Sequence, residues 1–221
     1  MAALENLEFW WDPVARGGPE NMAVDGWLLD QEVAVLRAYD WEGSWGSLGY
    51  FGELATARKV LPGVPLVRRA TGGGVVDHRD DLTYTLAIPR ECRLAGAKGS
   101  ESYRIIHSAL AAALHKAGHE VYLVHEDHYI DSSSCFAKPV AWDLIDGRGA
   151  KIAGAGQRRT RKGLLHHGSI MLQDAADGTE ILMELASELA QLVKPSENDP
   201  SGDELSSLVS QFSDAAWLDR R

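Results

Sequence analysis

The sequence predicts a single mixed α/β domain, and three observations carry that prediction. Apolar residues alternate with Thr and Ala over residues 82–88, a pattern typical of a strand. Residues 102–118 place Ile, Ala and Leu at helical spacing and end on glycine, as many helices do. The chain has 221 residues and is 45% hydrophobic, which is enough to bury one full core. Strands interspersed with helices favour a layered structure in which helices pack on a sheet.

Neighbouring segments add further elements on both sides of these two. Residues 21–31 carry Val24, Trp27 and Leu28 at helical spacing and should begin an amphipathic helix. The turn-rich Asp-Gly-Arg-Gly at residues 146–149 separates two apolar segments and is typical of a β-hairpin. We expect strands over residues 64–67, 121–124, 142–145, 151–158 and 163–172.

Two helices are expected near the C-terminus, at about residues 179–193 and 202–212. Leu185, Leu189 and Leu192 share one face of the first helix. Ser201 and Glu204 form a capping box ahead of the second. A polar loop should join the two helices.

Charge and composition exclude several classes of protein. A formal net charge of −10 repels nucleic-acid phosphate, so no nucleic-acid partner is expected. No apolar run reaches about 18 residues, and residues 1–9 lack the basic, apolar and small-residue order of a signal peptide. We therefore expect a soluble, cytoplasmic protein without a membrane partner. Cys92 and Cys135 are too few for a disulfide framework or a Cys-rich zinc site. His125 and His128 follow no standard ligand spacing, so no metal site is predicted from the protein pattern.

Three consecutive glycines, Gly72, Gly73 and Gly74, lie between two expected strands. Such a run is costly in conformational entropy, so the backbone should adopt positive φ or let another group approach closely. A bound ligand is the favoured reason, because exposed amides can form a nest for an anion or a carbonyl oxygen, and Arg69 could clamp phosphate or carboxylate. A tight structural turn is the alternative. The pattern is neither a P-loop nor a dinucleotide-binding fingerprint.

Lys151 begins a strand rich in glycine and alanine, where missing side chains leave space for a ligand. If this lysine is buried it needs a counter-charge, which a bound phosphate or a polarised carbonyl would supply. The alternative is a solvated lysine at the end of a hairpin.

Several motifs occur together and in a fixed order. They are Asn-Met-Ala-Val-Asp at 21–25, Ser-Leu-Gly-Tyr-Phe at 47–51, Arg-Arg-x-x-Gly-Gly-Gly-x-Val-x-His ending at His78, Leu-Thr-Tyr at 82–84, Lys-Ile-Ala-Gly at 151–154, and His167-Gly168. Over residues 21–172 the chain thus resembles the lipoate–protein ligase A family and its octanoyltransferase and amidotransferase relatives. The resemblance implies a biotin/lipoate ligase-like catalytic domain, a mixed, largely antiparallel sheet flanked by helices. We expect one such domain over residues 1–221 and no accessory C-terminal domain, while the biotin ligase signature is missing.

The resemblance implies that a lipoyl or octanoyl group is joined to the ε-amine of a lysine on a lipoyl domain. Lys151 is the catalytic candidate, because an ammonium group there could hold the activated acyl group and ease deprotonation of the incoming lysine. The residues expected to bind substrate or adenylate are Arg69, Gly72, Gly73, Gly74, His78, Gly154, His167 and Gly168. The favoured route is a ligase that uses ATP and Mg²⁺ to activate lipoate or octanoate as an acyl-adenylate.

An alternative route needs no cofactor beyond the acyl donor. Cys135 would take octanoyl from an acyl carrier protein as a thioester and pass it on. A non-catalytic acyl-binding relative is the second alternative. The lipoyl-domain partner would be of the 2-oxoacid dehydrogenase or glycine cleavage type, and a separate accessory subunit would also fit. The basic run Arg158, Arg159, Arg161 and Lys162 should dock the lipoyl domain.

Other candidates lie outside these motifs. His107, His115 and His119 fall on or next to the helix over residues 102–118 and are expected at the surface. Trp41 and Trp45 could line an apolar tunnel for the acyl chain.

Overall fold

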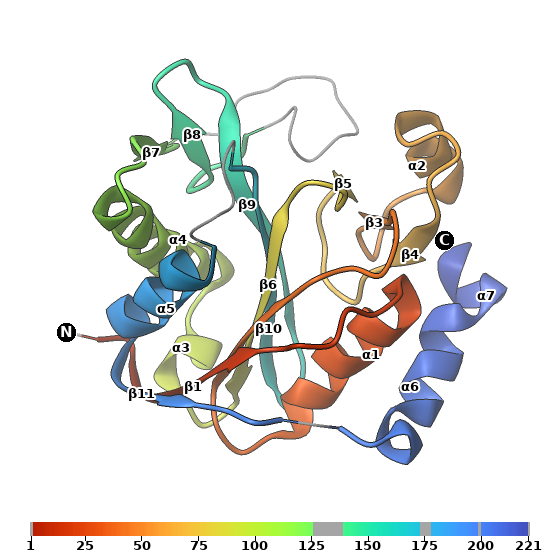
Figure 1. Cartoon of the computed structure of the whole chain (residues 1–221), viewed down its shortest axis with the longest axis horizontal. Coiled ribbons are helices and arrows are strands. Elements are labelled where there is room, and N and C mark those ends of the chain that lie inside the picture. The colour runs from red at the N-terminus through yellow and green to blue at the C-terminus, as the bar shows by residue number, and fades with distance from the viewer. Residues whose placement is uncertain (1, 126–138, 173–177, 199, 221) are drawn as a thin grey trace.

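A computed structural model describes residues 2–125, 139–172, 178–198 and 200–220, and its centre is an eight-stranded mixed sheet (Figure 1). The strand order is β11-β1-β2-β6-β10-β9-β8-β7. Pairing is parallel from β11 through β1 to β2 and antiparallel across the rest of the sheet. The strands are β1 (Leu4–Trp11), β2 (Val35–Tyr39), β6 (Leu82–Pro89), β7 (Val121–Leu123), β8 (Leu144–Asp146), β9 (Lys151–Arg159), β10 (Gly163–Ile170) and β11 (Ala190–Pro195). The expected mixed, largely antiparallel sheet is confirmed.

Helices cover both faces of this sheet (Figure 1). One face packs against α3 (Arg93–Gly96), α4 (Gly99–Lys116) and α5 (Gly178–Leu189), which supply most of the larger core. The opposite face packs against α1 (Gly18–Trp27), its 3-10 extension η1 (Leu28–Asp30) and α6 (Gly202–Ser213). The predicted capping box of α6 is present, because Ser201 Oγ accepts from Glu204 N and the Glu204 carboxylate accepts from Ser201 N. None of the described helices is long and apolar enough to cross a membrane.

A small three-stranded sheet lies beside the main one (Figure 1). It comprises β3 (Gly46–Leu48), β4 (Leu66–Arg68) and β5 (Val75–Asp77). Helix α2 (Leu54–Val60) connects β3 to β4. The glycine run connects β4 to β5. The short helix α7 (Ala215–Leu218) packs against this sheet, where Arg68 donates to the carbonyls of Trp217 and Leu218.

Most predicted elements are confirmed, but the region after residue 189 is not. The first C-terminal helix ends at Leu189, and the chain continues as β11 instead of extending the helix to residue 193. Leu192 pairs with Asn6 of β1 and is half exposed, so its helical spacing was coincidental. Strands β1 and β2 were not expected either. Strands β1, β2 and β11 form because each pairs with a strand distant in sequence, and local periodicity does not indicate such pairing.

Candidate functional site

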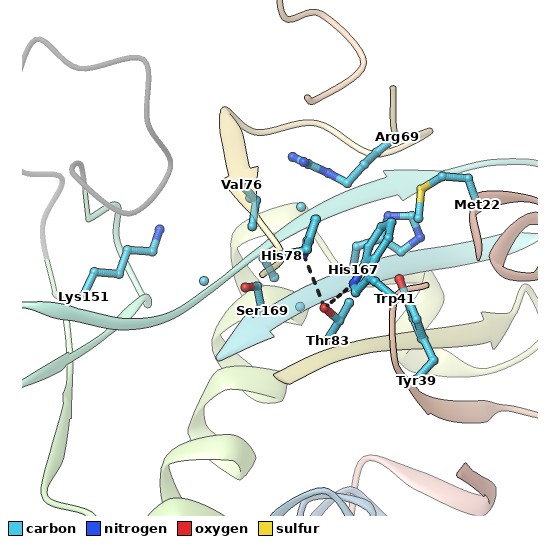
Figure 2. Close-up of a pocket in the computed structure, with 14 residues that line it drawn as sticks. Met22, Tyr39, Trp41, Arg69, Val76, His78, Thr83, Lys151, His167 and Ser169 are labelled. Carbon is cyan, nitrogen blue, oxygen red and sulfur yellow. Dashed lines mark hydrogen bonds between the residues drawn. The ribbon is translucent and has the colours of Figure 1, made fainter. Parts of the chain in front are cut away.

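A cleft of about 430 Å³ opens on the face of the sheet that carries α1 (Figure 2). Antiparallel register places Thr83, Ser169 and Gly154 opposite one another on neighbouring strands, and their side chains share this face. The cleft is lined by Met22, Tyr39, Trp41, Arg69, Val76, His78, Thr83, Lys151, Gly154, Ala155, Gly156, His167, Gly168 and Ser169.

Lys151 lies at one end of the cleft, apart from the aromatic residues at the other (Figure 2). Its Nζ is 2.7 Å from Asp143 Oδ2, and the side chains of the two residues are 4% and 0% exposed. Lys151 is therefore buried, and its counter-charge is the Asp143 carboxylate. From the sequence, a bound phosphate or carbonyl was expected in that role. A Cβ atom on Gly154 would overlap Lys151 Cε and Nζ, so the missing side chain leaves the space that the lysine occupies.

The Asp143 carboxylate is held from the other face of the sheet by Tyr103 of α4. Tyr103 Oη donates to Asp143 Oδ1 at 2.6 Å and accepts from Ala155 N at 2.8 Å. Burial, reinforced by the nearby Asp143 carboxylate, raises the pKa of Tyr103 well above its ordinary value. The hydroxyl thus keeps its proton and remains a donor to the carboxylate.

The glycine run forms a loop at the rim of the cleft that packs closely against segments on both sides. Gly73 has φ +99°, which confirms the predicted positive φ. A Cβ on Gly49 would overlap Gly73 O, and one on Gly156 would overlap Gly72 O. Two glycines far apart in sequence therefore allow the loop to approach both neighbouring segments. The predicted positive φ is therefore present at Gly73. The close approach depends on Gly49 and Gly156 instead, since a Cβ on Gly72 would meet nothing within 4 Å.

Arg69 stabilises this loop through hydrogen bonds from its guanidinium group. Its Nη1 donates to Ser47 Oγ at 2.6 Å, and its Nη2 donates to the carbonyls of Gly72 and Gly74, each at 3.1 Å. Arg69 is 5% exposed and lines the cleft. The guanidinium group thus positions the loop, in addition to any contact that it makes with a ligand.

His78 connects the loop to the sheet through a chain of hydrogen bonds. His78 Nε2 is 2.6 Å from Ser47 Oγ, and its Nδ1 is 2.9 Å from Asp81 Oδ2. Trp41 stacks on the imidazole with a ring separation of 4.2 Å and donates from Nε1 to Thr83 Oγ1. The order Ser-His-Asp resembles a hydrolase triad, but Ser47 is fully buried and does not line the cleft. The geometry assigns His78 to positioning and lining.

His167 joins the glycine loop to a buried charged network. Its Nδ1 is 3.0 Å from Thr71 Oγ1, while its Nε2 is 3.3 Å from Asp25 Oδ2 without hydrogen-bond alignment. Arg37 Nη1 donates to Asp25 Oδ1 at 2.7 Å. Burial opposes the charge of Asp25, yet Arg37 and His167 outweigh it, so the pKa of this carboxyl lies below its ordinary value. Asp25 therefore stays ionised at neutral pH.

Most predicted binding residues come together here. Those that line the cleft are Arg69, His78, Lys151, Gly154, His167 and Gly168, with the loop of Gly72, Gly73 and Gly74 at its rim. Trp41 lines the cleft as expected, whereas Trp45 packs on Gly18 and does not. Cys135 lies outside the described residues, as does most of the His125–His128 segment. Among the described residues no group of three His, Cys, Asp or Glu side chains could hold a metal ion.

Sequence reasoning missed Asp143 and Tyr103. Asp143 follows the only positive-φ non-glycine residue of the described chain, Trp142 at φ +72°, a backbone feature that no sequence pattern reported. Tyr103 is on a helix that packs on the opposite face. The only sequence indication of these residues was indirect: a buried lysine requires a nearby carboxylate, so the burial considered for Lys151 implied an acidic partner.

The basic residues of the run 158–162 have two different environments in the structure. Arg158 Nη1 donates to Ala70 O at 3.2 Å, and Arg159 Nη2 donates to Ala97 O at 2.9 Å and to Ser102 Oγ at 2.6 Å, so both have internal partners. Arg161 and Lys162 are exposed at the turn between β9 and β10, where Lys162 contacts Asp30. Docking of a partner by this run stays a prediction, centred on the two exposed residues.

His107 corrects an expectation. The sequence placed it at the surface, but it is fully buried beneath the sheet, and its Nδ1 donates to Trp142 O at 2.7 Å. His107 is on the face of α4 that packs on the sheet, where its ring lies 5.6 Å from that of His166 in β10. Burial disfavours the imidazolium and lowers the pKa of His107 to about 4. His107 is therefore neutral at pH 7, with its proton on Nδ1.

This buried histidine predicts an acid-sensitive fold. Between the ordinary value of 6.5 and about 4, the unfolded chain binds a proton that folded His107 does not. Stability present at neutral pH should therefore fall as pH drops through this window, by roughly 3 kcal/mol from His107 alone. Urea unfolding across the window measures the loss, and His107→Asn should flatten the slope. An unchanged slope in that variant would assign the acid sensitivity to other groups.

Comparisons with known proteins place this cleft in a family. The description "Lipoyl protein ligase A/B catalytic domain" matches residues 18–210, a range that contains every residue lining the cleft. The octanoyltransferase LipM of Lysinibacillus sphaericus is 32% identical over 172 residues, which are 69% of this chain and 61% of that protein. LipM of Staphylococcus aureus is 33% identical over 184 residues, 74% of this chain and 66% of that protein. The chain thus spans about six tenths of the length of the first of these relatives.

Solved structures share the fold. A candidate lipoate protein ligase from Thermoplasma acidophilum with bound lipoic acid has a TM-score of 0.68 at 20% identity, covering 97% of this chain and 99% of that one. A lipoate-protein ligase A bound with ATP has a TM-score of 0.67 at 19% identity, covering 97% of this chain and 98% of the other. Motif order, the sheet with its cleft and the match over residues 18–210 agree, and the chain belongs to the lipoyl protein ligase A/B catalytic domain family.

Proposed function

We propose that this protein transfers an octanoyl group from an acyl carrier protein to the ε-amine of a lysine on a lipoyl domain, without ATP. The observation that carries the proposal is the identity of about one third to octanoyltransferases, within a family match that includes the whole cleft. The sequence motifs alone favoured the ATP-dependent ligase. These relatives support the transferase route instead.

The cleft suits a medium-chain acyl group held by its two ends. Met22, Tyr39 and Trp41 provide an apolar end, and Lys151 provides a charged end (Figure 2). An acyl chain with its tail against the first group would place its carbonyl near the ammonium. Apolar contact along the chain supplies binding free energy, at about 0.8 kcal/mol for each buried methylene.

In the proposed reaction a thiolate attacks the carbonyl carbon of the donor thioester. A new thioester forms as the C–S bond to the carrier breaks, and the departing carrier sulfur takes up the proton that the enzyme thiol gave up. The neutral amine of the acceptor lysine then attacks this thioester, and the amide forms as the C–S bond to the enzyme breaks. The nitrogen loses one proton, which the departing enzyme sulfur takes up. Each attack places negative charge on the carbonyl oxygen, which the Lys151 ammonium would stabilise. A cation nearby also favours the neutral, nucleophilic form of the incoming lysine.

The thiol proposed for this reaction is Cys135, on the basis of the sequence alone. The proposed acceptor is a lipoyl-domain protein of the 2-oxoacid dehydrogenase or glycine cleavage type. Arg161 and Lys162, exposed on a strongly negative chain, would dock an acidic carrier. The anion-binding features of the cleft, Arg69 and the glycine loop, also suit a nucleotide phosphate, so the ATP route is a defined outcome of the test.

The test mixes the protein with octanoyl-carrier protein and no lipoyl domain. Intact mass should show one added octanoyl group on the wild type, labile to hydroxylamine and absent from Cys135→Ala. Adding lipoyl domain should then move the label to the acceptor without ATP. If Cys135→Ala and Cys135→Ser modify the lipoyl domain only with lipoate or octanoate and ATP, the protein is a ligase and the proposal is wrong. Modification under neither condition would favour a non-catalytic acyl-binding protein.

A further inference from the structure

Part of β9, beside the cleft, contacts a side chain of α4 in place of a neighbouring strand. Strand β8 pairs with β9 only around Leu144 and Ile145, opposite Ala153 and Lys151. Beyond this point, Ala155 N donates to Tyr103 Oη at 2.8 Å, where a neighbouring strand would otherwise accept. A side chain of α4 therefore contacts both the backbone of β9 and the carboxylate that pairs with Lys151, without lining the cleft itself.

The Asp143 carboxylate is held on both oxygens. Oδ1 accepts from Tyr103 Oη at 2.6 Å, while Oδ2 accepts from Val140 N at 2.8 Å and lies 2.7 Å from Lys151 Nζ. The carboxylate is fully buried, so water does not compete for these positions. Its orientation, and with it the position of the ammonium, depends on the hydroxyl from the opposite face.

His107, one turn after Tyr103 on α4, holds the backbone that presents Asp143. Its Nδ1 is 2.7 Å from Trp142 O, and Trp142 N is 2.6 Å from Val124 O. Trp142 has φ +72°, a left-handed conformation that is costly for a bulky residue and persists only where its surroundings enforce it. Tyr103 and His107 stack with a ring separation of 4.1 Å.

We infer that Tyr103 and His107 are positioning residues for the proposed acyl transfer, acting from the far face of the sheet through Asp143 on Lys151. Tyr103 sets the orientation of the carboxylate, and His107 holds the turn that carries it. The inference rests on the proposed function, because it assumes that Lys151 acts on the acyl group. Neither side chain lines the cleft, so neither should contribute to binding of the acyl donor.

Tyr103→Phe removes only the hydroxyl and should lower kcat by about tenfold to a hundredfold, the range for a hydrogen bond to a charged group. KM for the acyl donor should change less than about twofold, because the lining of the cleft is intact. Tyr122→Phe is the matched control, since that hydroxyl contacts exposed Glu120 and should leave kcat unchanged. A variant with normal kcat, or with the loss confined to KM, would overturn the inference.

His107 is tested by a pair of variants. His107→Leu removes the donor to Trp142 O and should lower kcat, whereas His107→Asn places an amide donor near the Nδ1 position and should recover part of it. His115→Leu is the control on the same helix, because His115 Nε2 donates to Val121 O at 2.8 Å, away from the site. Equal losses in His107→Leu and His107→Asn would assign His107 to packing alone.

A second readout does not depend on the function. Lys151 should react slowly with a small amine-reactive reagent, because its ammonium is buried in the ion pair. Peptide mass spectrometry should show faster modification of Lys151 in Tyr103→Phe, at an unchanged rate for exposed Lys116. If the wild type transfers no octanoyl group but this difference is present, the proposed function fails and the positioning stands. If Lys151 reacts equally fast in both proteins, the positioning fails whatever the activity.

Discussion

A Lys151→Ala variant is expected to lose octanoyl transfer by about a hundredfold to a thousandfold, the range for removing one donor aimed at developing negative charge. The buried ammonium at the end of the cleft is 2.7 Å from Asp143, and in the proposed transfer it would meet the acyl carbonyl. Single-turnover transfer to a lipoyl domain, followed by intact mass, measures the loss.

Removing the lysine also leaves the Asp143 carboxylate buried without its ion-pair partner, which should lower the free energy of unfolding by about 3–5 kcal/mol. Activity must therefore be compared at a temperature where circular dichroism shows both proteins folded. Lys151→Arg keeps a positive charge beside Asp143, and should fold better yet remain slow because a guanidinium cannot occupy the same position. Lys116→Ala, at an exposed lysine paired with Glu184, is the control and should transfer normally. Near-normal turnover by folded Lys151→Ala would remove this residue from the mechanism.

Gly154→Ala should lose transfer by a similar factor, with a smaller loss of stability than Lys151→Ala, because both charges of the buried ion pair remain. The new Cβ would overlap Lys151 Cε and Nζ, which form the flexible end of a side chain and can move aside. It would also lie 3.1 Å from Asp143 Oδ1, so the ion pair that holds the ammonium in place should be disturbed. Because the residue that moves is the proposed catalytic lysine, the added methyl group should lower the transfer rate much more than it lowers the unfolding temperature. Transfer rate and thermal unfolding, measured on the same sample, give both quantities.

The control for this substitution is Gly96→Ala. A Cβ there would meet nothing within 4 Å, and Gly96 is at the end of α3, remote from the cleft lining. Gly96→Ala should leave both transfer and unfolding near the wild-type values. If Gly154→Ala also transfers at the wild-type rate, the lysine tolerates displacement and its exact position is not important.

Some of the site could be read directly from local sequence. Three adjacent glycines predicted a strained or closely approached backbone, and Gly73 has φ +99° with neighbouring carbonyls packed against Gly49 and Gly156. The Asp-Gly-Arg-Gly turn predicted the hairpin of β8 and β9, which the structure confirms. In each case the cause is local: conformational freedom of glycine and turn propensity act over a few residues.

The sequence by itself therefore determined the family, the mixed sheet and helices, and the residues that gather at the cleft, among them Arg69, Lys151 and His167. Only the tertiary structure decided what those residues contact. Tyr103 is 40 positions from Asp143 in the chain and contacts it beside the backbone of β9. Strand β11 pairs with β1, although the two are separated by almost the full length of the chain. This pairing ends α5 at Leu189, where local periodicity had predicted that the helix continues. Burial and strand pairing depend on contacts between distant segments, and those contacts, unlike helical spacing or a glycine turn, leave no local pattern to read.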